Sequence, residues 1–349
     1  MTPNPADQRI AETQKALRAN PSSAEPHIDL AAEYCRKARD SEEISYYYKA
    51  EAELETALKL APGNYDAQKL KVTVLLGRNE FEAALKLAGE LNHRIPDDIA
   101  LWGLLAEINA ALGNYKEALR DAQWVLDLRP GSTLGFTEAA RLREAYHDSE
   151  GAIEFYEEAR RRTSLSDAEE RAWLLIQVAR LTAQSGDRRR AGVLFEDARK
   201  LNPGSQLAIA GLARLRMMEG NYSEAVSLFE KRYKAIQDAR SLYDLAEALQ
   251  RAGRADEAAT AFLNFETKAQ GEAARPYNAN IDLIHYYLER KSNAAEALAI
   301  ATRESAIRRD SETMDVLAQA CQAAQAQVEA TLNDSERTAC RTEQASKRR

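Results

Sequence analysis

The sequence predicts an all-α solenoid built from stacked helix–turn–helix units. The first observation is a row of alanines that recur at steps of about 34 residues, with two longer steps of about 39 residues. These alanines are Ala50, Ala84, Ala118, Ala152, Ala191, Ala225, Ala258 and Ala297. The second is a matching row of prolines, since Pro62, Pro96 and Pro130 recur at the same shorter step, and Pro203 follows after one shorter and one longer step. A small residue in mid-unit and a proline at its end, repeated at about 34 residues, are typical of such an array.

The clearest unit, residues 99–132, shows why two helices are expected in each repeat. Its first half has apolar residues at helical spacing: Leu101, Trp102, Leu105, Ala106, Ile108 and Leu112. Gly113-Asn114 ends this helix, because glycine readily adopts the left-handed closing conformation. A second stripe follows: Tyr115, Ala118, Leu119, Ala122, Val125, Leu126 and Leu128. Pro130 ends it. Neither stripe can be buried alone, so the units must stack.

These residues resemble the tetratricopeptide repeat. The matching positions of this unit are Trp102, Leu105, Ala106, Gly113, Tyr115, Ala118 and Pro130. About eight units in phase extend the resemblance over roughly residues 6–332. It implies a right-handed superhelix whose first helices line a concave groove. It also implies a protein-interaction function without catalysis. The family's known clamp for a C-terminal carboxylate, which uses lysine and asparagine, is missing, because Lys69 is followed by Thr73 and Arg141 is preceded by Thr137.

The repeat pattern divides the chain into four parts. Residues 1–23 are expected to form a lone capping helix, and 24–310 about eight repeats. A C-terminal capping helix is expected over 311–332, and a mobile polar tail over 333–349, so about 18 helices are predicted in total. Three insertions interrupt the spacing, between Tyr34 and Tyr47, at 164–170 and at 270–276. We expect them to form loops that bend the stack locally.

Composition excludes several classes of function. With 55 acidic and 48 basic residues, the net charge is −7, which disfavours general nucleic-acid binding. No apolar run approaches the ~18 residues of a membrane span. No signal peptide is recognisable, and three scattered cysteines fit a reducing compartment. A cytoplasmic location is therefore expected, or a periplasmic or secreted one if a signal peptide has been removed.

The sequence contains no pattern typical of an enzyme. It has no phosphate-binding glycine loop, HExxH pair or Gly-x-Ser-x-Gly elbow. The four histidines lie in different repeats without the spacing of metal ligands. We therefore expect no catalytic residue, no metal and no cofactor.

Groove positions suggest where a partner could bind. One register position holds Arg141, Arg180 and Arg214 in successive repeats. The neighbouring positions hold Trp173, Ile176, Leu207, Met217, Met218, Tyr243, Arg251 and Tyr286, with Arg240 and Arg290 further along. Arginine forks pair with carboxylates, and aromatic or methionine side chains anchor a guest. Together they predict a groove for a segment with acidic and apolar side chains.

Two other interpretations of the groove remain open. The arginines could pair with Glu144, Glu247 or Glu289 on adjacent helices, while Trp173 packs between repeats. The third repeat offers small residues instead, which leave open space around Glu107: Ala100, Gly103, Ala110 and Ala111.

The predicted function is a protein-interaction scaffold of unknown oligomeric state that binds a partner segment in its groove. One alternative is an accessory or targeting subunit of a separate enzyme complex, which a co-purifying enzyme would favour. A less favoured alternative is a nucleic-acid-binding helical-repeat protein, which salt-dependent RNA retention would favour.

Overall fold

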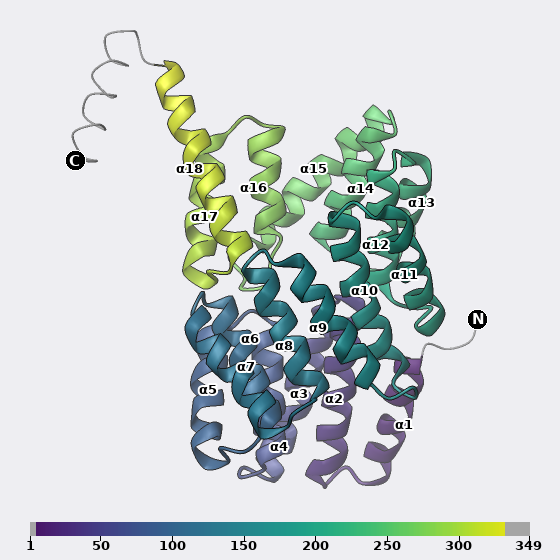
Figure 1. Cartoon of the computed structure of the whole chain (residues 1–349), viewed down its shortest axis with the longest axis vertical. Coiled ribbons are helices and arrows are strands. Elements are labelled where there is room, and N and C mark those ends of the chain that lie inside the picture. Colours follow the sequence, from purple (N-terminus) through teal and green to yellow (C-terminus); the bar gives the residue numbers. More distant parts are fainter. Residues whose placement is uncertain (1–4, 332–349) are drawn as a thin grey trace, which may run out of the picture.

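The chain forms a continuous all-α solenoid, seen in a computed structural model that describes residues 5–331 (Figure 1). Eighteen helices and no strand are present in this range, which confirms the predicted fold class and helix number. The lone terminal helices are α1 (Pro5–Ala19) and α18 (Ser311–Thr331). The predicted tail, 333–349, lies outside the described residues.

Sixteen helices between them form eight consecutive pairs. The first helices of the pairs are α2 (Ala24–Ser41), α4 (Tyr65–Gly77), α6 (Ile99–Ala111), α8 (Thr133–Ala145), α10 (Ala168–Gln184), α12 (Gln206–Met218), α14 (Ala239–Arg251) and α16 (Asn280–Glu289). The second helices are α3 (Ser45–Leu60), α5 (Phe81–Arg94), α7 (Tyr115–Leu128), α9 (Ser149–Arg162), α11 (Arg188–Leu201), α13 (Tyr222–Ala235), α15 (Ala255–Glu272) and α17 (Ala294–Ile307).

Local chemistry explains where the helices begin and end. Asp98 accepts hydrogen bonds from the amides of Ala100 and Leu101, and so caps the N-terminus of α6. Gly113 follows the same helix with φ 76°, as the sequence predicted. The eight phased alanines are all fully buried, which confirms that they occupy the close contacts between helices.

The three insertions behave differently from the prediction. The residues added after Tyr34 lengthen α2 to 18 residues and leave only a short connection before α3. Part of the second insertion lengthens α10, and part of the third lengthens α15. The expectation of loops was therefore wrong for most of the first insertion, whereas 164–167 and 273–276 of the other two lie outside the helices.

The lengthened segments bring distant repeats into contact. Arg9 and Arg39, near the N-terminus, pair with Glu169 and Glu170 of α10 at 2.6 and 3.0 Å. The side-chain amide of Asn79 donates to the carbonyl of Pro276 at 3.2 Å. In Figure 1 the C-terminal helices α17 and α18 lie at the upper left, above α5, α6 and α7. The solenoid therefore curls far enough for its two halves to touch.

Two further contacts reinforce this closure. Arg232 of α13 is completely buried, lies 2.5 Å from the Glu42 carboxylate and donates to the Ser241 hydroxyl at 2.6 Å. The backbone amide of Arg309 donates to the carbonyl of Ala111 at 2.8 Å. Because buried charges are costly unless paired, the Arg232–Glu42 contact ties the closed arrangement together.

Candidate functional site: an apolar channel joined to a charged cavity

An apolar channel crosses the concave side of four first helices. It has a volume of about 410 Å³ and is lined by α2, α4, α6 and α8. Its apolar wall consists of Ile28, Ala32, Leu70, Ala100, Gly103, Leu104 and Leu134. The channel includes Glu107, Ala100 and Gly103 of the small-residue region that the sequence singled out in the third repeat, whereas Ala110 and Ala111 line the neighbouring cavity. The volume falls within the range of ligand-sized pockets.

The channel exists because small residues occupy the α6 face. Ala100 is exposed and Gly103 carries no side chain. A Cβ on Gly103 would lie 2.8 Å from a methyl of Leu134, so a larger residue would displace Leu134 and fill the channel. The start of α6 is held firmly, since Asp98 also accepts hydrogen bonds from Tyr65 at 3.0 Å and Lys69 at 2.8 Å. The channel wall is thus preorganised.

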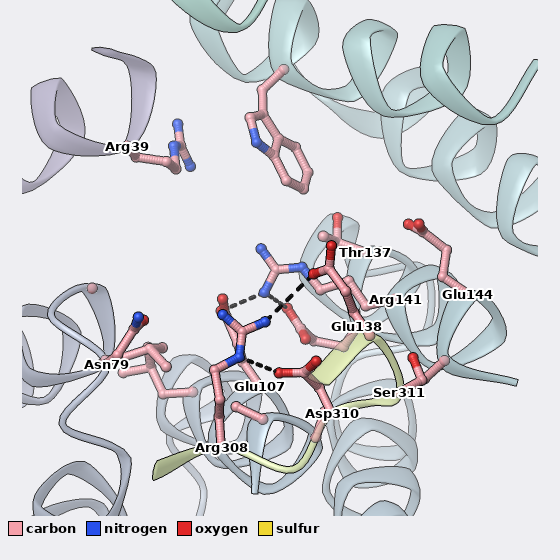
Figure 2. A pocket seen from close by; sticks show the side chains of 18 of the residues that line it. Arg39, Asn79, Glu107, Thr137, Glu138, Arg141, Glu144, Arg308, Asp310 and Ser311 are labelled. Carbon is pink, nitrogen blue, oxygen red and sulfur yellow. Dashed lines mark hydrogen bonds and ion pairs between the residues drawn. The ribbon is translucent and has the colours of Figure 1, made fainter. Parts of the chain in front are cut away.

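A larger, charged cavity of about 1400 Å³ adjoins the channel (Figure 2). Residues from both halves of the solenoid line it, from Arg39 of α2 to Arg308 and Asp310 beyond α17. Its carboxylates number eight: Glu107, Glu138, Glu144, Asp167, Glu170, Asp310, Glu312 and Asp315. Its arginines number five: Arg39, Arg141, Arg162, Arg180 and Arg308. The lining is therefore acidic on balance.

Every arginine of the cavity already has a carboxylate partner. Arg141 pairs with Glu107, and Arg180 pairs with Glu144. Arg39 lies 3.0 Å from Glu170, Arg162 lies 2.8 Å from Glu158, and Arg308 lies 2.6 Å from Asp310. Figure 2 shows the pairs around Arg141 and Arg308. An anionic guest would have to displace these internal pairs.

Glu138 is buried in the lining of this cavity, whereas Glu312 and Asp315 are exposed. Its side chain is 5% exposed, and the described residues donate no hydrogen bond to it. Its nearest cation is Arg141, with Nη1 3.6 Å from Oε1. Burial raises the pKa of Glu138 to about 8; the charges of Glu107 and Glu170 add to this rise and Arg141 opposes it. Glu138 is therefore a buried carboxyl whose ion pair with Arg141 is long, and which shares that guanidinium with Glu107.

The predicted groove residues are not all brought together. Arg141, Trp173 and Arg180 line the charged cavity, and the Arg141 guanidinium lies 5.4 Å from the Trp173 ring centre. Arg214 instead pairs with Asp244 at 2.9 Å. Arg251 lines a separate small pocket beside Gly220.

The apolar members of the predicted set mostly serve packing. Ile176 and Tyr286 are buried in hydrophobic clusters, so as they stand they offer no surface to a partner. Leu207, Met217 and Tyr243 pack against the same clusters, while Met218 is exposed. Trp173 contacts Tyr156 edge-on, which agrees with packing between repeats. The alternative arginine partners Glu144 and Glu247 are occupied, the latter by Arg290 at 2.6 Å.

Sequence reasoning missed Glu138 and the closure of the solenoid. Glu138 lies three residues before Arg141 on α8, hence on the same helix face, and that spacing was the available signal. No group of His, Cys, Asp and Glu suited to a metal occurs within residues 5–331. None of the helices described is long and apolar enough to cross a membrane.

Comparison with known proteins agrees with the fold. The family model described as tetratricopeptide repeat matches residues 47–108 and 183–240. No curated protein matches the sequence. Similar solved structures include the APC/C heterotetramer Cut9–Hcn1, with TM-score 0.59, 16% identity, and coverage of 84% of this chain and 55% of that one. This chain thus spans about half the length of that relative.

Human IFIT1 is similar over more of its length. The IFIT1 dimer with PPP-AAAA has TM-score 0.56 and 13% identity, covering 90% of this chain and 84% of that one. The dimer with m7Gppp-AAAA has TM-score 0.54 and 16% identity, covering 88% and 74%. At these identities the likeness concerns the fold. The eight helix pairs and the two matched regions together show the tetratricopeptide repeat fold.

Proposed function

We propose that this protein is a non-enzymatic interaction scaffold that binds an extended partner segment in the apolar channel of α2, α4, α6 and α8. The observation that carries the proposal is the preformed channel itself, with exposed Ala100 and the partly exposed Leu104 and Leu134 on its walls. A pocket with mostly apolar walls and a few polar groups at its edge is the usual form of a ligand site. A continuous wall from four repeats suits a segment that runs across several helices.

The sequence-based hypothesis of an acidic partner at Arg141, Arg180 and Arg214 competes with this placement. All three arginines pair with carboxylates of the same chain, so an acidic segment would bind only by exchanging one ion pair for another. Exposed exchanges of this kind contribute little, roughly 0–1 kcal/mol each. The apolar channel requires no such exchange, which favours it as the primary site.

A photo-crosslinking experiment tests the proposal. A photoreactive phenylalanine analogue placed at Ala100 should crosslink a defined partner in a lysate of the native host, whereas the same residue at exposed Ala83 of α5 should not. Ala100→Trp should then lower retention of that partner at least tenfold, and Ala83→Trp should leave it unchanged. Equal crosslinking from both positions would contradict the proposal.

Variants of the arginine row separate the competing placements. If Arg141, Arg180 and Arg214 form the site, their triple alanine variant should lose the partner while Ala100→Trp retains it. Our proposal predicts the opposite order. Recovery of RNA in place of a protein would instead favour the nucleic-acid alternative, against which the acidic balance of the cavity argues.

A further inference from the structure

The apolar channel and the charged cavity meet at two carboxylates. Glu107 and Glu138 line both spaces, together with Thr73, Leu104 and Leu134. A side chain anchored in the channel could therefore extend its far end directly to these acids. We call this set of five residues the junction.

The junction has an unequal distribution of charge. Glu107 is neutralised by Arg141, whereas Glu138 has only the more distant contact to the same guanidinium. One arginine thus faces two carboxyl groups in a largely dehydrated place. Buried carboxylates normally receive hydrogen bonds or a counter-ion, and Glu138 has room for a donor on its cavity side.

A positively charged donor fits this arrangement better than an anion. It would add a second cation beside Glu138, which now has only the 3.6 Å contact to Arg141, and leave the Arg141–Glu107 pair intact. A long side chain with an aliphatic stem also suits the apolar walls of Leu104 and Leu134, since lysine and arginine bury their stems while directing the charged end to polar groups. An acidic side chain would face two carboxyls and one occupied arginine.

We propose that the junction recognises a lysine or arginine side chain of the bound segment, adjacent to an apolar residue that fills the channel beside Ala100 and Gly103. This inference rests on the proposed function and specifies its ligand. The segment is therefore basic and apolar, in contrast to the acidic and apolar segment suggested by the arginine row. With its pKa raised to about 8, Glu138 is mostly protonated at neutral pH, and a cation bound beside it would favour the carboxylate form.

Synthetic peptides provide the test. The probes are short fluorescent glycine–serine peptides with one leucine and, one to four positions further on, lysine, glutamine or glutamate. The full chain should bind a lysine peptide at least tenfold more tightly than the glutamine peptide of the same spacing, and the glutamate peptide most weakly. Glu138→Gln should remove most of the lysine preference, while Glu117→Gln on the exposed side of α7 should preserve it.

The outcomes distinguish the two proposals. If leucine peptides bind regardless of charge and Ala100→Trp abolishes binding, the channel is the site and the inference about the cation is wrong. If the glutamate peptide binds best, the arginine row is favoured and the inference is also wrong. If no peptide binds and the crosslinking at Ala100 fails as well, both proposals fail.

Discussion

The first helices α6 and α14 occupy equivalent places in their repeats, yet they differ in the size of the side chain at one concave position. At the same distance before the phased alanine of each repeat, α6 has Gly103 and α14 has Tyr243. The tyrosine ring packs 4.8 Å from Phe265 and 6.0 Å from Phe262 between ring centres, whereas Gly103 leaves the channel open. One region fills this position with an aromatic ring, and the other has a buried glycine against which Leu134 packs at the wall of the channel.

This difference shows how a repeat array can separate stability from binding. Both helices retain the fully buried alanine contact with the following helix, Ala118 or Ala258, so the pairing of helices is unaffected. Stability in stacked repeats comes from such neighbouring contacts. The concave position can therefore vary between a packed aromatic and an open wall without loss of the fold.

The largest expected effect lies in the filled region. Phe265 is fully buried and contacts Tyr243 and Tyr286. We expect Phe265→Ala to lower the free energy of unfolding by about 3–5 kcal/mol, because it removes a large buried side chain and leaves a cavity. Leu104→Ala in the open channel should cost only about 1 kcal/mol, since its side chain is already partly exposed. Urea titrations followed by circular dichroism measure both. Equal losses would show that the two regions do not differ in packing.

Much of this comparison was accessible from the sequence. The phased alanines and the glycine and proline ends predicted the helix pairs, because those features depend on local chemistry. The open space near Ala100 and Gly103 was also visible, since small residues replaced large ones in a known register. The prediction of exposed groove residues was less accurate. Ile176 and Tyr286 were expected on the groove surface, but they lie close enough to the packing face to be buried.

The closure of the solenoid could not be predicted in the same way. Its contacts join residues far apart in the chain, such as Arg232 with Glu42 and Asn79 with Pro276. No periodicity relates these partners, and each depends on the accumulated rotation of several repeats. The raised pKa of Glu138 depends partly on charges from other repeats, such as Glu170 of α10. The position of Glu138 in the sequence of α8 therefore did not predict this rise.

A second experiment converts the open region into the filled one. Gly103→Tyr places in α6 the residue that α14 has at the equivalent position. The new ring should displace Leu134 and occupy the channel, which should weaken binding of the leucine–lysine peptide at least tenfold. The free energy of unfolding should fall by about 1–3 kcal/mol, because the ring crowds Leu134 and the loss of a helical glycine offsets only part of that cost.

A matched control for this change is Gly89→Tyr in α5. A Cβ on Gly89 meets no atom within 4 Å, so the new side chain has space. Peptide affinity measured by fluorescence anisotropy should remain unchanged in this control. If both tyrosines weakened binding equally, the loss at Gly103 would not come from filling the channel.

The last expected effect concerns the pH dependence at the junction. Glu138 is faced by Arg141 from its own helix, by Glu107 from α6 and by Glu170 from α10. Its folded-state pKa of about 8 lies above the ordinary value of 4.5. As pH rises between these values, the unfolded chain loses this proton and the folded chain keeps it, so ionisation favours the unfolded state. Glu138 should therefore lower stability increasingly from about pH 5 to pH 8 and no further above that.

Glu138→Gln removes this ionisation and should reverse its effect. The variant should gain stability over the natural chain at pH 8, by about 1.4 kcal/mol for each pKa unit of the rise that it abolishes, and the gain should vanish towards pH 5. Urea unfolding at the two pH values measures the difference, and exposed Glu117→Gln should show no such trend. An equal effect of the substitution at pH 5 and at pH 8 would mean that folding does not raise the pKa of Glu138, so that Arg141 already stabilises its carboxylate. The carboxyl groups of the junction would then already have sufficient positive charge beside them, and a basic side chain would gain no affinity by binding there.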